Sequence, residues 1–446
     1  MMEIEKHGIE AIPKAERNKH WWDLFTIQAG IAFSFPTLVI GSLLVPGLNW
    51  SQAVRVNLLG NAIVAVLVAL MGSYGVDHGL STTVASRFTL GHPLGTRLCS
   101  ILLLISLVGW YAVVNELAGL AVDGIVKNAF GFSAPALFII LVGAVNAIPA
   151  VLGFEEIKFL NRLAVPALAF LALWILKAIL AQHNFAQLIA AHSTGALTFS
   201  TGLDWIVGGY IVGVFIAPDY ARYTRGQADN WMGSLLGVLP PALFLGIVGV
   251  MSRLATGDQN PVTSVQTLGL GVSGLLLTVL STVPSSEASL YSAGLALTNV
   301  FPQRARWKNT VVVTILGAAL AVFGITKHLG DFLTWLSYAF SPLVGVSLCD
   351  YFILRGRRLV VEDAYMEESG EGRSRLRGLN GAAMGAIAVG IAAGAALSPG
   401  FPASLTSLVV GALIYYPLAI RSHASASIKT CVEKNDSANR PLDGSQ

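Results

Sequence analysis

The chain has 446 residues, of which 54% are hydrophobic and only 12% are charged, against ~25% charged residues in ordinary soluble domains. A soluble fold could not bury that much apolar surface, which excludes the soluble classes. The formal net charge of +3 says little by itself, because the positions of the charges carry the information. Cys99, Cys349 and Cys431 lie far apart without a CxxC pair, so neither a disulfide framework nor a zinc site is expected.

About a dozen long apolar stretches follow one another from Leu24 to Ile420. A bilayer core of ~30 Å needs ~20 apolar residues per helix, so the sequence predicts an all-α polytopic membrane protein with ~12 transmembrane helices. Residues 1–22 lack the apolar core of a secretory signal, and the first helix is expected to serve as its own insertion signal. The expected helices lie near residues 24–45, 52–73, 97–121, 133–152, 160–181, 199–218, 231–251, 266–290, 309–325, 329–353, 379–397 and 402–421.

Lys and Arg residues concentrate in every second gap between these apolar stretches. With the N-terminus inside, 23 of the 28 Lys and Arg residues fall in inside segments, whereas Arg55, Lys127, Arg253 and Lys327 fall outside and Lys177 lies within a span. We expect Lys177 to snorkel toward an interface. The positive-inside rule then predicts a multi-pass protein of the cell (inner or plasma) membrane with both termini cytoplasmic.

Two polar segments follow the tenth helix and the last helix. The loop 355–378 is the most charged part of the chain, and we interpret it as a solvated cytoplasmic loop or as a contact for anionic lipid or regulation. The polar tail 422–446 is expected to be disordered. The sequence has no GxxxxGK[ST] motif and no soluble domain large enough to hydrolyse ATP, so transport would have to be driven by a gradient.

Two spans contain residues that weaken a helix at membrane depth. The first is the segment from Gly30 to Pro36, and the second is the segment from Val207 to Gly213 in the sixth span. Proline removes a backbone donor and glycine lowers helix stability. Broken helices form binding sites in transporters, and an offset of five helices is what two repeated five-helix halves would produce.

The third span carries a Gly109-Trp110-Tyr111 sequence followed by Asn115 and Glu116. The aromatic rings offer a flat surface on which a planar ligand can stack. Asn115 lies four residues after Tyr111 and therefore on the same helix face. The alternative is that the rings pack and that Asn115 binds a neighbouring helix. The role of Glu116 stays open.

The eighth span is rich in hydroxyl groups and contains Glu287. A carboxylate at this depth costs on the order of 2.5–3.5 kcal/mol on insertion scales and should face the protein interior. It could accept hydrogen bonds from a ligand, bind a cation or carry a coupled proton, or it could be a structural charge paired to another helix. Asp219, near Arg222 and Arg225 at the cytoplasmic end of the sixth span, is expected to form a gate or loop salt bridge.

Several motifs, in order along the twelve spans, carry a resemblance to a known family. They are Gly8-Ile9-Glu10-Ala11-Ile12-Pro13, Trp22-Asp23-Leu24-Phe25, Arg87-Phe88-Thr89-Leu90-Gly91, Val108-Gly109-Trp110-Tyr111, Ala217-Pro218-Asp219-Tyr220-Ala221-Arg222-Tyr223, Ser289-Leu290-Tyr291-Ser292-Ala293-Gly294-Leu295, Ser341-Pro342-Leu343-Val344-Gly345 and Cys349-Asp350-Tyr351. Through them the chain resembles, from about Gly8 to Ala419, the nucleobase:cation symporter-1 family and its purine-cytosine permease branch.

The resemblance implies a LeuT-type fold of 5+5 helices in an inverted repeat plus two accessory helices. The corresponding segments are a tail 1–23, repeats 24–181 and 199–353, the charged loop 354–378, accessory helices 379–421 and the tail 422–446. It also implies import of a planar nitrogen heterocycle without a cofactor. By this resemblance the substrate contacts are Trp110, Asn115, Gly209, Tyr210, Ser286 and Glu287, with the base stacked between Trp110 and Tyr210.

A family sodium site corresponds to Gly30, Phe33, Ser34, Ser281 and Ser285, and the sequence departs from the family there. Pro284 stands where sodium-coupled relatives usually have a hydroxyl residue, which favours protons as the coupling ion, with Glu287 as their carrier. A second departure is Ser286-Glu287-Ala288, which replaces the Asn-Asp-Asn of cytosine permeases and leaves the identity of the substrate open.

The sequence thus predicts a symporter for a nucleobase or a closely related heterocycle, and it favours H⁺ over Na⁺ as the coupling ion. A vitamin-precursor or cationic heterocycle of the pyrimidine or pyridine type is the alternative substrate. A membrane-embedded enzyme is not expected, because the spans lack a nucleophile with a base and paired metal ligands. A channel is not expected either, because no continuous polar pore lining is evident.

Overall fold

The computed structural model describes residues 10–438 except residues 153, 302, 366–375, 377 and 399. Within these residues the chain forms helices and a single isolated β-bridge, between Lys19 and Thr224. Residues 366–375 and 377 of the loop 355–378, and residues 439–446 of the tail, lie outside the described residues, so the role predicted for the loop stays a prediction. Helix α17 (Ala403–Ala438) extends into the tail, so the disorder predicted for 422–446 is wrong as far as Ala438.

The first span is broken where the sequence predicts it. Helices α1 (Trp21–Ala32) and α2 (Phe35–Leu43) meet at a bend of 53°. Phe33 and Ser34 between them have non-helical backbone angles, and Pro36 lies in the first turn of α2, where its missing N–H costs nothing. The Thr37 hydroxyl donates to the carbonyl of Ala32 (2.9 Å), which satisfies one acceptor left free by the break.

The helices supply the twelve membrane-spanning segments that the sequence predicts. Six described stretches are long and apolar enough to cross a bilayer, and the bent pair of α1 and α2 makes a seventh. The first six comprise α3 (Trp50–His78), α5 (Leu94–Phe130), α7 (Phe154–Gln182), α11 (Gln227–Thr256), α15 (Leu329–Leu348) with its flanking turns, and α17 (Ala403–Ala438). The other five are the long α13 (Gly271–Val300) and the shorter apolar helices α6 (Pro135–Leu152), α9 (Phe199–Phe215), α14 (Arg306–Val322) and α16 (Gly381–Leu397).

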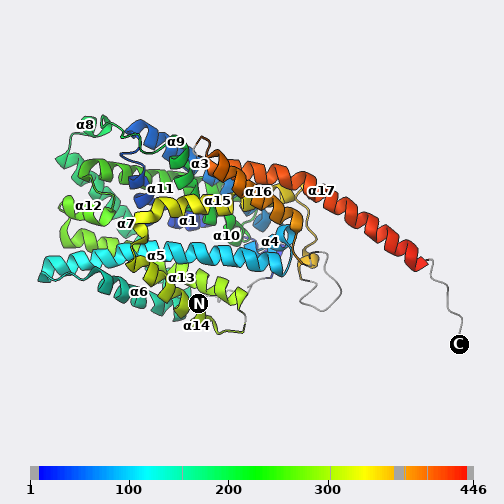
Figure 1. Cartoon of the computed structure of the whole chain (residues 1–446). Coiled ribbons are helices and arrows are strands. Elements are labelled where there is room, and N and C mark those ends of the chain that lie inside the picture. Colours follow the sequence, from blue (N-terminus) through cyan, green and yellow to red (C-terminus); the bar gives the residue numbers. More distant parts are fainter. Residues whose placement is uncertain are drawn as a thin grey trace.

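Short helices join the spans at both ends of the molecule. Helix α4 (Thr82–Leu90) connects α3 to α5, and α12 (Pro261–Thr267) connects α11 to α13. Figure 1 shows them at opposite ends of the helix assembly, which is the arrangement that two repeats of opposite orientation produce. The remaining short helices are η1 (Lys14–Glu16), α8 (Phe185–Ile189), α10 (Ala217–Ala221), η2 (Ile325–His328), η3 (Cys349–Leu354) and η4 (Val361–Ala364).

The spans pack as two bodies. Helices α1, α2, α3, α9 and α11 form one body, which we call the bundle, and α5, α6, α13 and α14 all contact one another in a second body, the four-helix unit. Glycines bring the bundle helices close together, because a Cβ atom at Gly249 of α11 would overlap the Leu38 carbonyl of α2. Helix α15 packs against α9 and α17.

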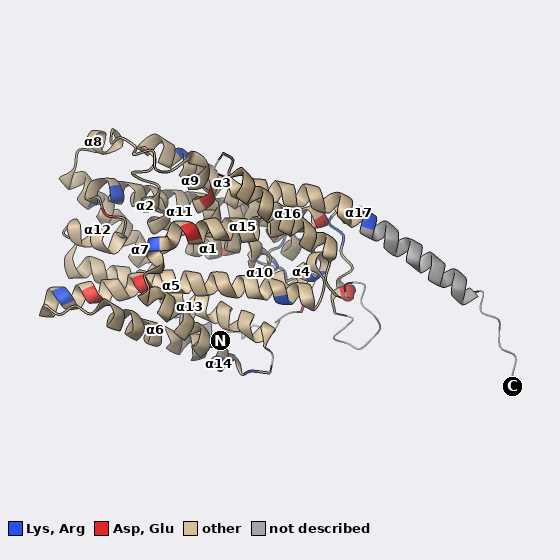
Figure 2. Ribbon diagram, in the orientation of Figure 1, with Lys and Arg blue, Asp and Glu red and all other residues tan. Residues whose placement is uncertain are grey.

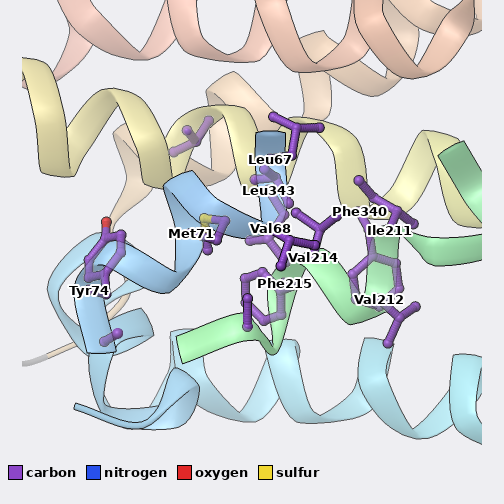
Figure 3. Close-up of a cluster of buried hydrophobic side chains, with 14 of the residues drawn as sticks. Leu67, Val68, Met71, Tyr74, Ile211, Val212, Val214, Phe215, Phe340 and Leu343 are labelled. Carbon is purple, nitrogen blue, oxygen red and sulfur yellow. The ribbon is translucent and has the colours of Figure 1, made fainter. Parts of the chain in front are cut away.

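An apolar core fills the bundle, while the outer faces of many helices are also apolar. Figure 3 shows buried side chains of α3, α9 and α15, among them Leu67, Met71, Phe215 and Phe340, meeting in one cluster. Large apolar side chains stay exposed on α6, α7 and α14, as expected for surfaces that face lipid. Charged residues are sparse along most of the helices in Figure 2.

The predicted break between Val207 and Gly213 is wrong. Helix α9 continues through this segment to Phe215, and the interruption comes at Ile216, just before Pro218. A Cβ atom at Gly208 would overlap the Leu333 carbonyl of α15, so this glycine permits close helix packing. The helix stops instead where proline removes a backbone donor.

Candidate functional site

Trp110 lies in the middle of α5, where the four-helix unit meets α15. Its side chain is half-buried, and its ring meets the ring of Phe332 edge to face, with centroids 5.6 Å apart and planes at 74°. Gly109 allows this approach, because a Cβ atom there would overlap the Phe332 ring. The ring of Trp335 is nearly parallel to that of Phe332 at 6.4 Å, so α15 contributes an aromatic wall next to Trp110.

Tyr210 of α9 borders the same apolar cluster as Trp110 and binds a residue of the broken first span. Its hydroxyl donates to Oε1 of Gln28, 3.0 Å away. Gln28 is only 1% exposed, and its Nε2 has no hydrogen-bond partner among the described residues. A buried amide donor without an acceptor is costly, so this group is available to a ligand.

Sequence reasoning missed Gln28. No motif contains it, and a single glutamine in an apolar helix is usually read as a packing residue. The available signal was its position, since it is an amide within a membrane span and only two residues before Gly30 in the segment predicted to break.

The break in the first span adds open space and a further ring. No atom lies within 4 Å of the position that a Cβ atom would take at Gly30. The ring of Phe33 is parallel to that of Phe244 of α11, with centroids 6.1 Å apart.

The predicted substrate contact Gly209 faces a side chain of α2, because a Cβ atom there would lie 2.6 Å from Cδ1 of Ile40. Gly209 therefore serves the packing of α9 against α2.

The hydroxyl and carboxyl groups of α13 differ in their surroundings. The Ser281 hydroxyl donates to the Leu277 carbonyl of its own helix at 2.5 Å, and Ser285 is half-buried. Ser286 and Glu287 are fully buried, and neither the Ser286 hydroxyl nor Oε2 of Glu287 has a partner among the described residues. These are the polar groups of α13 that stay free to bind something else.

Two candidate residues of α5 bind neighbouring elements. Nδ2 of Asn115 donates to the Ile139 carbonyl of α6 at 3.1 Å. Glu116 accepts hydrogen bonds from the backbone N–H of Thr326 (2.9 Å) and from its hydroxyl (2.5 Å). Glu116 thus anchors the turn that precedes α15, and the geometry of Asn115 favours the helix-packing interpretation.

The predicted cation ligands are oxygen atoms of α1, of the break between α1 and α2, and of α13. The Ser34 hydroxyl lies 3.3 Å from the Thr37 hydroxyl. The described part of the chain contains no group of three or more His, Cys, Asp or Glu side chains that could hold a metal ion. A cation at this place would depend on backbone carbonyl and hydroxyl groups.

A polar network ties α3 to the turn that follows α15. Asp77 accepts hydrogen bonds from Arg357 (2.7 Å) and from Tyr351 (2.6 Å). The hydrogen bond to Asp77 raises the pKa of the Arg357 guanidinium above its ordinary value. Nearby, Asp219 accepts a hydrogen bond from the Thr82 N–H at the start of α4 (2.8 Å), so it too connects elements at this end of the molecule.

Comparisons with known proteins agree with this architecture. The family described as "Permease for cytosine/purines, uracil, thiamine, allantoin" matches residues 11–416. The hydantoin permease of Microbacterium maritypicum is 26% identical over 428 residues, covering 90% of this chain and 86% of that protein. The cytosine permease of Escherichia coli (strain K12) is 27% identical over 414 residues, covering 92% and 93% of the two chains.

Solved structures share the fold over nearly the whole chain. The inward-facing conformation of Mhp1 matches with a TM-score of 0.82 at 22% identity, over 94% of this chain and 95% of that one. Mhp1 in a closed conformation with bromovinylhydantoin, described as a nucleobase-cation-symport-1 family transporter, matches with a TM-score of 0.79 at 23% identity and the same coverage. The fold is therefore the LeuT-type inverted repeat with two accessory helices, and the chain belongs to the family of permeases for cytosine/purines, uracil, thiamine and allantoin.

Proposed function

We propose that the protein imports a nucleobase or a closely related planar nitrogen heterocycle by cation symport. The observation that carries this proposal is the buried Gln28 amide, which Tyr210 holds through Oε1 and whose Nε2 donor is free. The half-buried ring of Trp110 packs against the apolar cluster that contains Tyr210. Relatives named hydantoin permease and cytosine permease support the same substrate class.

The substrate ring would stack on Trp110 with Tyr210 on its other side. Planar heterocycles gain from stacking on aromatic faces, and their ring carbonyl and nitrogen atoms need polar partners in a dry site. The free Nε2 of Gln28 would donate to such an acceptor. We leave out the predicted contact Ser286, because it adjoins Glu287 on α13 inside the four-helix unit. We leave Asn115 and Gly209 out, because both face neighbouring helices.

The proposed coupling ion is the proton. Pro284 stands where a hydroxyl ligand for sodium is expected, and the Ser281 hydroxyl already donates within α13. Glu287 is a buried carboxyl group without a described partner, which suits a proton carrier. A sodium site formed by Gly30, Phe33, Ser34, Ser281 and Ser285 is the alternative.

Transport would proceed by alternating access, with the bundle moving against the four-helix unit around a site near the middle of the membrane. Both termini would be cytoplasmic in the cell membrane. The division of the chain into repeats 24–181 and 199–353 stays part of this proposal.

One observation favours a second substrate class. The unpaired carboxyl group of Glu287 would suit a cationic heterocycle, such as a pyrimidine or pyridine vitamin precursor, if the substrate reached it. A neutral base would not need this charge.

Thermal unfolding of the detergent-purified protein tests the substrate class. Nucleobases, hydantoin and cationic heterocycles would be compared with and without sodium, because a ligand that binds the folded state raises its apparent stability by about 2.7 kcal/mol at 100 times its Kd. Stabilisation by a neutral nucleobase or hydantoin, independent of sodium, supports the proposal. Stabilisation only by cationic compounds supports the second class, and stabilisation that requires sodium contradicts the proton assignment.

A further inference from the structure

The interior of the four-helix unit contains several buried polar atoms without hydrogen-bond partners among the described residues. They are Oη of Tyr111, Oδ1 of Asn115, Nδ2 of Asn146, Oγ of Ser286 and Oε2 of Glu287. All five side chains are at most 5% exposed. Buried polar groups in proteins are nearly always hydrogen-bonded, so such a concentration of free ones indicates a ligand or water that belongs there.

Contacts between the helices place these residues at one level of the unit. A Cβ atom at Gly143 of α6 would lie 2.8 Å from Oη of Tyr111 and 3.0 Å from Nδ2 of Asn115, so both side chains meet α6 there. Asn146 lies three residues further along α6, which puts it on the same face one turn away.

Glu287 lies at the level of Tyr111 by the register of α13 with α14. These antiparallel helices are aligned by Gly294, whose Cβ atom would overlap the Thr310 hydroxyl. Glu287 is seven residues, or two turns, before Gly294 on α13. Gly317 is likewise two turns after Thr310 on α14. In antiparallel helices, Glu287 and Gly317 therefore lie at the same level and face the same interface. A Cβ atom at Gly317 would overlap the Tyr111 ring, which brings that ring to the level of Glu287.

The packing of α13 on α5 gives the same result. Leu290, three residues after Glu287, packs with Tyr111 and Val313 in one apolar cluster. At the other end of the two helices, the side chain of Leu275 on α13 approaches Gly124 on α5, which fixes the antiparallel register of α13 with α5. Glu287 lies twelve residues after Leu275, and Ala112 lies twelve residues before Gly124. Glu287 is therefore opposite Ala112. The carboxyl group therefore faces the interior of the four-helix unit, behind the face of α5 that carries Trp110.

We infer that Glu287, Tyr111 and Asn146, with Ser286 and the Asn115 carbonyl, form a hydrated proton-binding site inside the four-helix unit, separate from the stacking site. This inference rests on the proposed function and specifies where its coupling proton binds. Glu287 takes up H⁺ on its carboxylate and returns it to water, and Tyr111 and Asn146 bind the waters that connect the carboxyl group to solvent. No bond other than O–H forms or breaks.

Few other titratable groups face this carboxyl group in the described part of the chain. On α5 the facing group is Tyr111, since Glu116 is bound to Thr326. Helices α6 and α14 present Asn146, Thr310 and Thr314 at the interface, and on α13 itself Tyr291 lies one turn away. On α7 the described basic residue, Lys177, is exposed. The charge state of Glu287 therefore responds to the proton and to hydration rather than to a described ion pair.

Tyr111 gives this site a route to the substrate. It follows Trp110 directly in α5, so a heterocycle that shifts the Trp110 ring also shifts the backbone that holds the Tyr111 hydroxyl. Proton occupancy and substrate occupancy would then favour the same arrangement of α5 against the bundle, as symport requires.

The test compares two assays of reconstituted protein. Accumulation of a labelled heterocycle under an imposed proton gradient requires the proton to bind and leave, whereas equilibrium exchange of labelled for unlabelled substrate does not require it to leave. For Glu287→Gln we expect at least a tenfold loss of accumulation, with exchange and the thermal shift by substrate retained within about twofold. The rate of exchange should lose its dependence on pH. Glu116→Gln is the matched control, and it should keep the pH dependence.

Tyr111→Phe removes one oxygen atom and keeps the ring, so it tests the site even if Glu287→Gln is unstable. It should shift the pH dependence of accumulation while leaving the substrate affinity unchanged.

Loss of substrate binding by folded Glu287→Gln would overturn the inference, because Glu287 would then be a substrate ligand. Unchanged accumulation and pH dependence in both variants would also overturn it. Sodium-driven accumulation by the unmodified protein, without a proton requirement, would overturn it while leaving heterocycle import intact, and absence of any heterocycle transport would instead refute the proposed function.

Discussion

At the scale of single residues, the proposal depends most on Trp110. Its ring is half-buried and packs at the edge of two apolar clusters, so part of it stays available as a stacking surface. Stacking of a base on an aromatic ring contributes about 1–3 kcal/mol by alanine substitution.

We therefore expect Trp110→Ala to weaken substrate binding by roughly 5- to 150-fold, which corresponds to about 1–3 kcal/mol, and Trp110→Phe to weaken it less. Substrate titration of the purified protein measures this. Trp174→Ala is the control, because Trp174 packs beside the lipid-facing Phe170 on α7. Equal affinities for Trp110→Ala and the control would refute the stacking role.

Gln28 supplies a second prediction. Replacement by leucine removes the free donor and should reduce affinity about 10-fold, the effect of losing a hydrogen bond of about 1.4 kcal/mol. Tyr210→Phe keeps the ring but releases Oε1 of Gln28, so it should give a smaller loss. The same titration decides the matter, and a larger loss for Tyr210→Phe than for Gln28→Leu would contradict this order.

The sequence predicts both aromatic residues of the proposed site, but it does not point to Gln28. Trp110 and Tyr210 stand out because rings beside glycine are unusual at membrane depth. Asn115 and Glu116 were candidates because polar residues are rare there, yet both bind neighbouring elements, and the cross-helix partners Ile139 and Thr326 are remote in sequence. A sequence pattern gives the helix face of a residue but not the helix that covers it.

At the scale of elements, glycine does two different things in this chain. The segment between Gly30 and Pro36 breaks the first span, as predicted, because proline and an extended Ser34 end the hydrogen-bond ladder. The glycines of α9 leave the helix intact and bring it against α15. The glycine of the broken first span and the glycines of α9 look alike in the sequence. They differ in whether the backbone of another helix packs against them, which the sequence does not show.

A close approach of this kind should show in stability. Gly249→Ala would force a methyl group into the Leu38 carbonyl, and overpacking of this type costs about 1–3 kcal/mol. Gly385→Ala on α16 is the matched control, since no atom lies within 4 Å of its Cβ position. Thermal unfolding in one detergent should show a lower midpoint for Gly249→Ala only, and equal midpoints would contradict the close contact.

The short connecting helices were not predicted. Helices α4 and α12 have 9 and 7 residues, which is too few for a clear apolar period. The eighth span was predicted at 266–290, whereas α13 covers Gly271–Val300. The apolar character of Leu268 and Leu270 extended the prediction into the turn after α12, and the many Ser and Thr residues after Ser281 ended it too early.

At the scale of the whole molecule, the count of twelve spans follows from hydropathy, because each span must bury about 20 apolar residues in lipid. The two-body arrangement does not follow from hydropathy. It depends on contacts between spans that are five or six positions apart in the chain, such as α5 with α13 and α1 with α11, that a one-dimensional pattern cannot show.

The orientation of the molecule is directly testable. Cys99 and Cys349 are buried, so single cysteines added to a Cys431→Ser background report on their own position. Phe132→Cys, before α6, should react with a membrane-impermeant maleimide in intact cells. Gln303→Cys, before α14, should react only after permeabilisation. The reverse pattern would place both termini outside.

The most direct measurement is uptake by proteoliposomes of labelled cytosine, uracil and hydantoin under an imposed inward proton gradient. The protein is predicted to accumulate at least one of these heterocycles above its external concentration, without sodium, and to lose this accumulation when the gradient is collapsed or when Trp110 is replaced by alanine. Equilibration without accumulation, or no uptake of any of the three, would contradict a proton-driven importer of nucleobase-type heterocycles.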